Sequence, residues 1–130
     1  MQPRLFFSIG CALAFTGVAL GAFGAHALKV RLAPEQLATF EVGVRYQLIH
    51  ALALLAVAWA CTRWSGRAAQ ASGWLFVAGT VLFSGSLYLS TLAGVRGLGL
   101  VTPIGGAALL AGWLCLLVAP WGAKRAADDI

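Results

Sequence analysis

The chain has 130 residues, of which 61% are hydrophobic and 10% are charged, and its formal net charge is +5. A soluble domain carries roughly 25% charged residues, and a chain this short leaves too much surface in water to hide so many apolar side chains. The basic residues stand at the ends of apolar runs, as membrane flanks do, and form no stripe that would bind nucleic acid. We therefore expect an integral membrane protein.

The apolar residues fall into four long windows. A bilayer core of about 30 Å requires about 20 residues of apolar helix, and four stretches meet this length, at about residues 5–25, 44–62, 72–93 and 102–121. Helices are expected because lipid offers no partners to unpaired backbone groups. The chain is therefore predicted to be a single all-α transmembrane domain over residues 1–130, folded as a four-helix bundle. Thr102 and Pro103 are the predicted N-cap and first residue of the fourth helix.

The first two spans are joined by a more polar segment. From Pro34 onward, the spacing of Leu37, Phe40 and Val44 predicts a short interfacial helix, amphipathic and lying along the membrane surface between spans 1 and 2. Gly43 is where we expect the chain to bend into the second span.

The end of the first span resembles a signal-peptidase site, because His26 is flanked by Ala25 and Ala27. The apolar run before it is longer than the roughly 7–15 residues of a signal-peptide core. We therefore expect this segment to be retained as a membrane span.

The basic residues are divided almost evenly between the two sides of the membrane. With four spans, both termini lie on one side, which carries five basic residues against four on the other. This difference favours both termini in the cytoplasm by the positive-inside rule. The first group is Arg4, Arg63, Arg67, Lys124 and Arg125, and the second is Lys29, Arg31, Arg45 and Arg96.

Small residues recur on one face of the first and fourth spans. Such faces let helix backbones approach closely, which matters in lipid because burial from water no longer drives helices together. Stripes on several spans favour packing inside the bundle, and the alternative is a face for dimerisation or for a larger membrane complex. The residues are Gly10, Ala14, Gly17, Gly21 and Gly24 in the first span, and Gly105, Ala108 and Gly112 in the fourth.

Polar side chains gather toward the membrane face opposite the termini. Because consecutive spans run in opposite directions, the end of one span and the start of the next lie near the same face. These residues predict either a pocket for a small polar ligand or a set of hydrogen bonds that ties helix ends together, and we favour the hydrogen bonds because such bonds are common near membrane interfaces. The set is His26, Arg45, Tyr46, Gln47, His50, Ser84, Ser86, Tyr88 and Thr102.

Helical spacing places Tyr46 and Gln47 on the same face as His50, and puts Glu41 four residues before Arg45, where the two can pair. Two histidines with no carboxylate or cysteine evidently near them make a poor metal site, so we expect neither a metal nor a cofactor. The sequence has no HExxH or GxSxG motif and no cysteine and histidine at matching depth. We therefore expect no catalytic residues and no enzymatic activity.

Four short blocks resemble the signature blocks of the YgdD-like family. They are GAFGAHAL (Gly21–Leu28), YQLIHALALL (Tyr46–Leu55), FSGSLY (Phe83–Tyr88) and TPIGG (Thr102–Gly106), and they occur in the expected order, one per span. The family comprises small inner-membrane proteins, with animal relatives, and is a domain of unknown function. The resemblance implies a four-span, multi-pass protein of the bacterial inner membrane. The motif positions that it carries over are His26, Tyr46, Gln47, His50, Ser84, Gly85, Tyr88, Thr102, Pro103, Gly105 and Gly106.

We expect the chain to be a non-enzymatic accessory or scaffolding protein of the membrane. Its expected partners are the bilayer and either a second copy or a larger membrane complex. The alternative is a small binding or transport protein for a polar metabolite, a proton or a lipid headgroup, which would enter the cluster around His26 and His50. An enzyme acting on a lipid-soluble substrate is a third reading.

Overall fold

The computed structural model describes residues 2–128, and the side chains of residues 2–122. It contains four long helices, α1 (Gln2–His26), α2 (Pro34–Arg63), α3 (Arg67–Leu92) and α4 (Val101–Asp128), and one turn of 3₁₀ helix, η1 (Leu28–Val30). All four are long and apolar enough to cross a membrane. At 1.5 Å per residue, the 25 residues of α1 reach about 38 Å, which exceeds the bilayer core of about 30 Å. The predicted all-α fold with four spans is confirmed.

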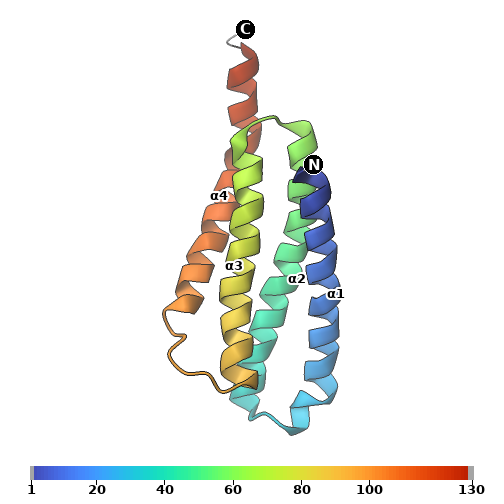
Figure 1. The fold of residues 1–130 in the computed structure, drawn as a ribbon, viewed down its shortest axis with the longest axis vertical. Coiled ribbons are helices and arrows are strands. Elements are labelled where there is room, and N and C mark those ends of the chain that lie inside the picture. Colours follow the sequence, from blue (N-terminus) through green and yellow to red (C-terminus); the bar gives the residue numbers. More distant parts are fainter. Residues whose placement is uncertain (1, 129–130) are drawn as a thin grey trace.

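The helices lie side by side in chain order. α1 packs against α2, α2 against α3, and α3 against α4, as the left-to-right order α4, α3, α2, α1 in Figure 1 shows. Within residues 2–128, α1 and α4 do not pack along each other, so α2 and α3 form the centre of the bundle. Consistent with this, α2 has the largest share of buried residues among the four spans.

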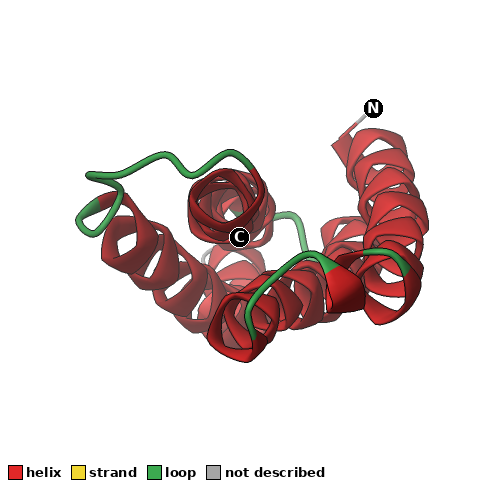
Figure 2. Ribbon diagram, turned by 90° about the horizontal axis from the view of Figure 1, so that it is seen from below, coloured by secondary structure: helices red, strands yellow, loops and turns green. Residues whose placement is uncertain are grey.

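The connections are short and alternate between the two ends of the bundle. Residues 64–66 join α2 to α3 at the end where both termini lie (Figure 1). The α1–α2 and α3–α4 connections lie at the opposite end, which Figure 2 views from below. The side chains of Lys124 and Arg125, which the charge count includes, lie outside the described residues.

The expected interfacial helix is not a separate element. Pro34 is the first residue of α2, and the helix continues through Gly43 to Arg63. Gly43 is buried, and a Cβ there would lie 2.8 Å from Cε1 of Tyr88, so its missing side chain allows close contact with α3. η1 is the one helical element between the end of α1 at His26 and the start of α2 at Pro34. The prediction of a distinct amphipathic helix from Pro34 is therefore wrong.

The fourth helix begins at Val101, before the predicted N-cap. The carbonyl oxygen of Leu98 accepts hydrogen bonds from the backbone N–H groups of Val101 and Thr102, at 3.1 and 3.3 Å. Thr102 therefore lies inside the first helical turn, and its hydroxyl does not cap the helix. Pro103 is tolerated in this turn because the first N–H groups of a helix have no partner within the helix.

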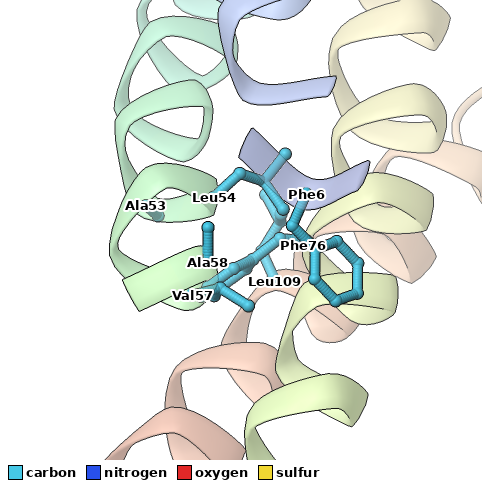
Figure 3. Packing of buried hydrophobic residues seen from close by; sticks show 7 residues of the cluster. All are labelled: Phe6, Ala53, Leu54, Val57, Ala58, Phe76 and Leu109. Carbon is cyan, nitrogen blue, oxygen red and sulfur yellow. The ribbon is translucent and has the colours of Figure 1, made fainter. Parts of the chain in front are cut away.

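The largest buried cluster draws on all four helices. Phe6 of α1 and Phe76 of α3 are both fully buried, as are Leu54 and Val57 of α2. Figure 3 shows the seven side chains of this cluster converging from the four helices. They are Phe6, Ala53, Leu54, Val57, Ala58, Phe76 and Leu109.

The glycines of the predicted small-residue faces of α1 and α4 lie against neighbouring helices of the same chain. In α1, a Cβ at Gly10 would lie 2.9 Å from the carbonyl oxygen of Ala51 on α2. In α4, a Cβ at Gly105 would meet the backbone nitrogen of Phe83 on α3. The other contacts of this kind join Gly17 to Leu48, Gly21 to Val44, Gly24 to Phe40 and Gly112 to Phe76, whereas Ala14 and Ala108 are half-buried.

Candidate functional site

One glutamine side chain connects three helices. Gln47 of α2 is buried, and its Nε2 donates to the carbonyl oxygen of Leu13 at 2.9 Å and to Oγ1 of Thr16 at 2.8 Å, both on α1. Its Oε1 accepts a hydrogen bond from the Tyr88 hydroxyl of α3 at 2.6 Å. The amide therefore has its donor and acceptor groups engaged inside the bundle, where an unpaired amide would be costly.

Two serines of α3 connect that helix to α2 and to α4. The Ser84 hydroxyl donates to the carbonyl oxygen of Gly43 on α2 at 2.7 Å. The Ser86 hydroxyl lies 2.5 Å from Oγ1 of Thr102 on α4. Both serines are buried. Every pair of adjacent helices is thus joined by at least one side-chain hydrogen bond.

His50 of α2 connects to α4 through an indole. Its side chain is 3% exposed, and its Nε2 lies 3.0 Å from Nε1 of Trp113. Nδ1 lies 2.7 Å from the carbonyl oxygen of Tyr46, one helical turn earlier. An indole N–H can only donate, and a carbonyl oxygen can only accept. His50 is therefore neutral in this arrangement, with its proton on Nδ1 and with both ring nitrogens engaged.

Aromatic rings surround His50. The ring of Phe76 lies 5.4 Å from the imidazole and 4.9 Å from the ring of Trp113, between centroids. Tyr46 packs on Phe83 at 4.8 Å. These separations fall in the range of favourable aromatic contacts. The rings hold Trp113 in the position from which it donates to His50.

A groove opens on the outer side of this aromatic group. It has a volume of about 640 Å³ and lies between α2 and α4, with α3 contributing Phe83. Its lining is mostly apolar, and Arg45 is its one charged residue. The lining residues are Arg45, Tyr46, Ile49, His50, Phe83, Pro103, Gly106, Ala107, Leu109, Leu110 and Trp113.

The structure separates His26 from the rest of the predicted polar set. His26 is exposed at the end of α1 and takes part in no side-chain hydrogen bond with another described residue. The neighbouring Gly24 packs on Phe40, which is ten residues before His50 and therefore about 15 Å from it along α2. The two histidines do not share a site.

Arg45 and Tyr46 lie at the outer edge of the cluster. Both are exposed. Glu41 and Arg45 are four residues apart, a spacing that suggested an ion pair. Arg45 forms no ion pair with Glu41 or with any other described residue. Its guanidinium is therefore free to face the groove that it lines.

Sequence reasoning missed Thr16 and Trp113. Thr16 follows an apolar run and its hydroxyl also bonds the carbonyl oxygen of Ala12 at 2.9 Å, which gives no hint of a partner on α2. Trp113 lies near the middle of α4, whereas tryptophan in membrane proteins gathers at the interfaces. A buried indole N–H needs a hydrogen-bond acceptor. The position of Trp113 in the sequence could therefore have predicted a polar partner on a neighbouring helix.

No group of three or more His, Cys, Asp or Glu side chains comes together among the described residues. Cys11, Cys61 and Cys115 are free thiols on α1, α2 and α4, and Cys11 is exposed.

Comparison with known proteins identifies the family. Residues 20–106 match the model described as "Protein of unknown function (DUF423)". The chain belongs to this family. The matched range includes the groove-lining residues up to Gly106 and all the predicted polar residues.

Relatives of similar length occur in several bacteria. The UPF0382 membrane protein YwdK of Bacillus subtilis is 40% identical over 117 residues, which cover 89% of this chain and 95% of YwdK. The UPF0382 inner membrane protein YgdD of Escherichia coli is 39% identical over 125 residues, covering 96% of this chain and 95% of YgdD. A UPF0382 membrane protein of Staphylococcus aureus is 40% identical over 116 residues, covering 89% of this chain and 94% of that protein.

No solved structure matches this chain. Together with the four spanning helices, the relatives establish a multi-pass membrane protein, and the predicted resemblance to the YgdD-like family and the inner-membrane location are confirmed. The family has no named biochemical role.

Proposed function

We propose that this member of the family is a non-enzymatic accessory protein of the membrane. The observation that carries the proposal is that the buried polar side chains of the cluster are engaged in joining helices. Gln47, Ser84 and His50 each have their polar atoms bonded to another part of the chain. A general base or nucleophile must present a free atom to its substrate, and the ring nitrogens of His50 are both in use.

The outer faces of α1 and α4 are among the surfaces that other molecules can reach. Phe15 of α1 is 77% exposed and Leu117 of α4 is 67% exposed. Because the small residues of these helices face inward, large apolar side chains cover the outside. An accessory protein would contact lipid and membrane-protein partners through these faces.

Site-specific photo-crosslinking tests this role. A photoreactive phenylalanine analogue at Phe15 or at Leu117 is expected to form adducts with a membrane protein when cells are irradiated. The matched control is the same variant purified and reconstituted into liposomes, where only lipid adducts or adducts between two copies can form. If both positions yield lipid adducts alone in cells, the accessory role is wrong.

The proposal includes the orientation of the protein in the membrane, with both termini in the cytoplasm. It is supported by the excess of one basic residue on the terminal side. A fluorescent protein fused to the C-terminus should fluoresce, and alkaline phosphatase fused there should be inactive. The reverse pattern would contradict this orientation.

Ligand binding is the second candidate function. It is favoured by the groove between α2 and α4, which adjoins His50 and carries Arg45. His26 lies apart from this groove, so a ligand there would not contact both histidines. Substituting His50 with Gln and measuring binding and stability together would separate a ligand contact from a structural one.

A further inference from the structure

The groove between α2 and α4 runs lengthwise along α4. Pro103 lies at one end of its lining and Trp113 at the other, and ten residues of helix separate them, which is about 15 Å. Pro103 is in the first turn of α4, beside the α3–α4 connection. The groove therefore extends from the first turn of α4 to the middle of that helix.

The inner end of the groove is apolar in character. Trp113 and His50 line it, but their polar ring atoms are bonded to each other, so they present ring surface rather than free donors. Ala107, Leu109 and Leu110 supply aliphatic surface along the α4 wall. Such a lining suits a hydrocarbon chain and offers nothing to a polar metabolite at this depth.

The outer end of the groove carries a positive charge. Arg45 is five residues, or about 7.5 Å, before His50 on α2, on the side of the α3–α4 connection. It is exposed and forms no ion pair with a described residue. A guanidinium presents several donors in a planar fork that matches the geometry of a phosphate group. The groove thus combines a cationic outer end with an apolar floor.

We propose that this groove binds one acyl chain of a bilayer phospholipid with a net anionic headgroup, whose phosphate pairs with Arg45. The chain lies along α4 between Pro103 and Trp113. The headgroup lies at the interface, where lipid phosphates normally reside. The groove opens laterally, so a lipid enters it directly from the bilayer. The site requires no protein partner, so it stands independently of the accessory role.

Competitive lipid binding tests the headgroup contact. The purified protein in detergent receives an equal mixture of phosphatidylglycerol and phosphatidylcholine with the same acyl chains, and native mass spectrometry counts the bound molecules of each. The wild type should retain phosphatidylglycerol preferentially. Arg45→Gln should lower that preference about tenfold, because the guanidinium attracts the net negative headgroup of phosphatidylglycerol, whereas the choline cation of phosphatidylcholine offsets its phosphate charge. The control Arg31→Gln removes an exposed charge at the same end of the bundle and should keep the preference.

A blocked groove tests the acyl-chain contact. Ala107 is exposed within the groove, and Ala107→Trp should reduce the retention of both lipids. The control Ala19→Trp adds the same bulk to an exposed position of α1 that does not line the groove. Circular dichroism and gel filtration establish that each variant is folded. If Ala107→Trp does not fold, Leu110→Trp, at a 70% exposed lining position, supplies the same test.

Three results would overturn the proposal. The first is a wild type that binds the two lipids equally. The second is a preference for phosphatidylglycerol that Arg45→Gln and Arg31→Gln lower to the same extent, which would indicate general surface attraction. The third is a wild type that is a dimer and an Ala107→Trp variant that is a monomer, which would assign the groove to a second copy of the chain.

Discussion

Replacing Gln47 with Leu should destabilise the protein by about 2 kcal/mol. The substitution keeps a similar volume but removes three interhelical hydrogen bonds, two to α1 and one to α3. Interhelical hydrogen bonds in membrane proteins contribute about 0.6 kcal/mol each on average, which gives about 2 kcal/mol for three. Thr16 still bonds the carbonyl oxygen of Ala12 at 2.9 Å, so the main unpaired group is the Tyr88 hydroxyl.

The assay is equilibrium unfolding in mixed micelles with sodium dodecyl sulfate as denaturant, followed by tryptophan fluorescence. Gln70→Leu is the matched control, because Gln70 is exposed on α3 and should change the free energy of unfolding little. In a double-mutant cycle, Tyr88→Phe should cost stability in the wild type but restore some in the Gln47→Leu background, because it removes the hydroxyl left unpaired there. A Gln47→Leu protein as stable as Gln70→Leu, or effects of Gln47→Leu and Tyr88→Phe that simply add, would refute this account.

Two further substitutions test the packing and the buried polar groups by the same unfolding measurement. Gly105→Ala should cost about 1–3 kcal/mol, because the added methyl would meet the backbone of Phe83 and force α3 and α4 apart. Gly106→Ala should be nearly neutral, since its nearest neighbour would be 3.8 Å away, and equal losses at the two positions would contradict the packing. Thr80→Val should leave stability unchanged or raise it by about 1 kcal/mol, because the buried Thr80 hydroxyl has no partner among the described residues. A large loss of stability in Thr80→Val would reveal a hydrogen bond that this arrangement lacks.

The sequence alone determined the membrane class and the four spans. Both follow from local composition, because a bilayer demands about 20 consecutive apolar residues and excludes unpaired backbone. It also predicted which helix ends meet, since four antiparallel spans alternate in direction. For this reason Gln47, Ser84 and Thr102 were expected near one another, and each is bonded to a neighbouring helix.

Tertiary structure decided how each helix is rotated about its axis. A hydrogen bond needs two groups at the same depth and on facing sides, and the sequence of one helix does not specify the rotation of its neighbour. That rotation brings Trp113 to His50, whereas His26 lies exposed at the end of α1. The run from Pro34 through Gly43 forms one helix with the second span because contact with α3 favours continuity over a bend. The groove beside Arg45 exists for the same reason, since its walls belong to helices that the sequence does not orient.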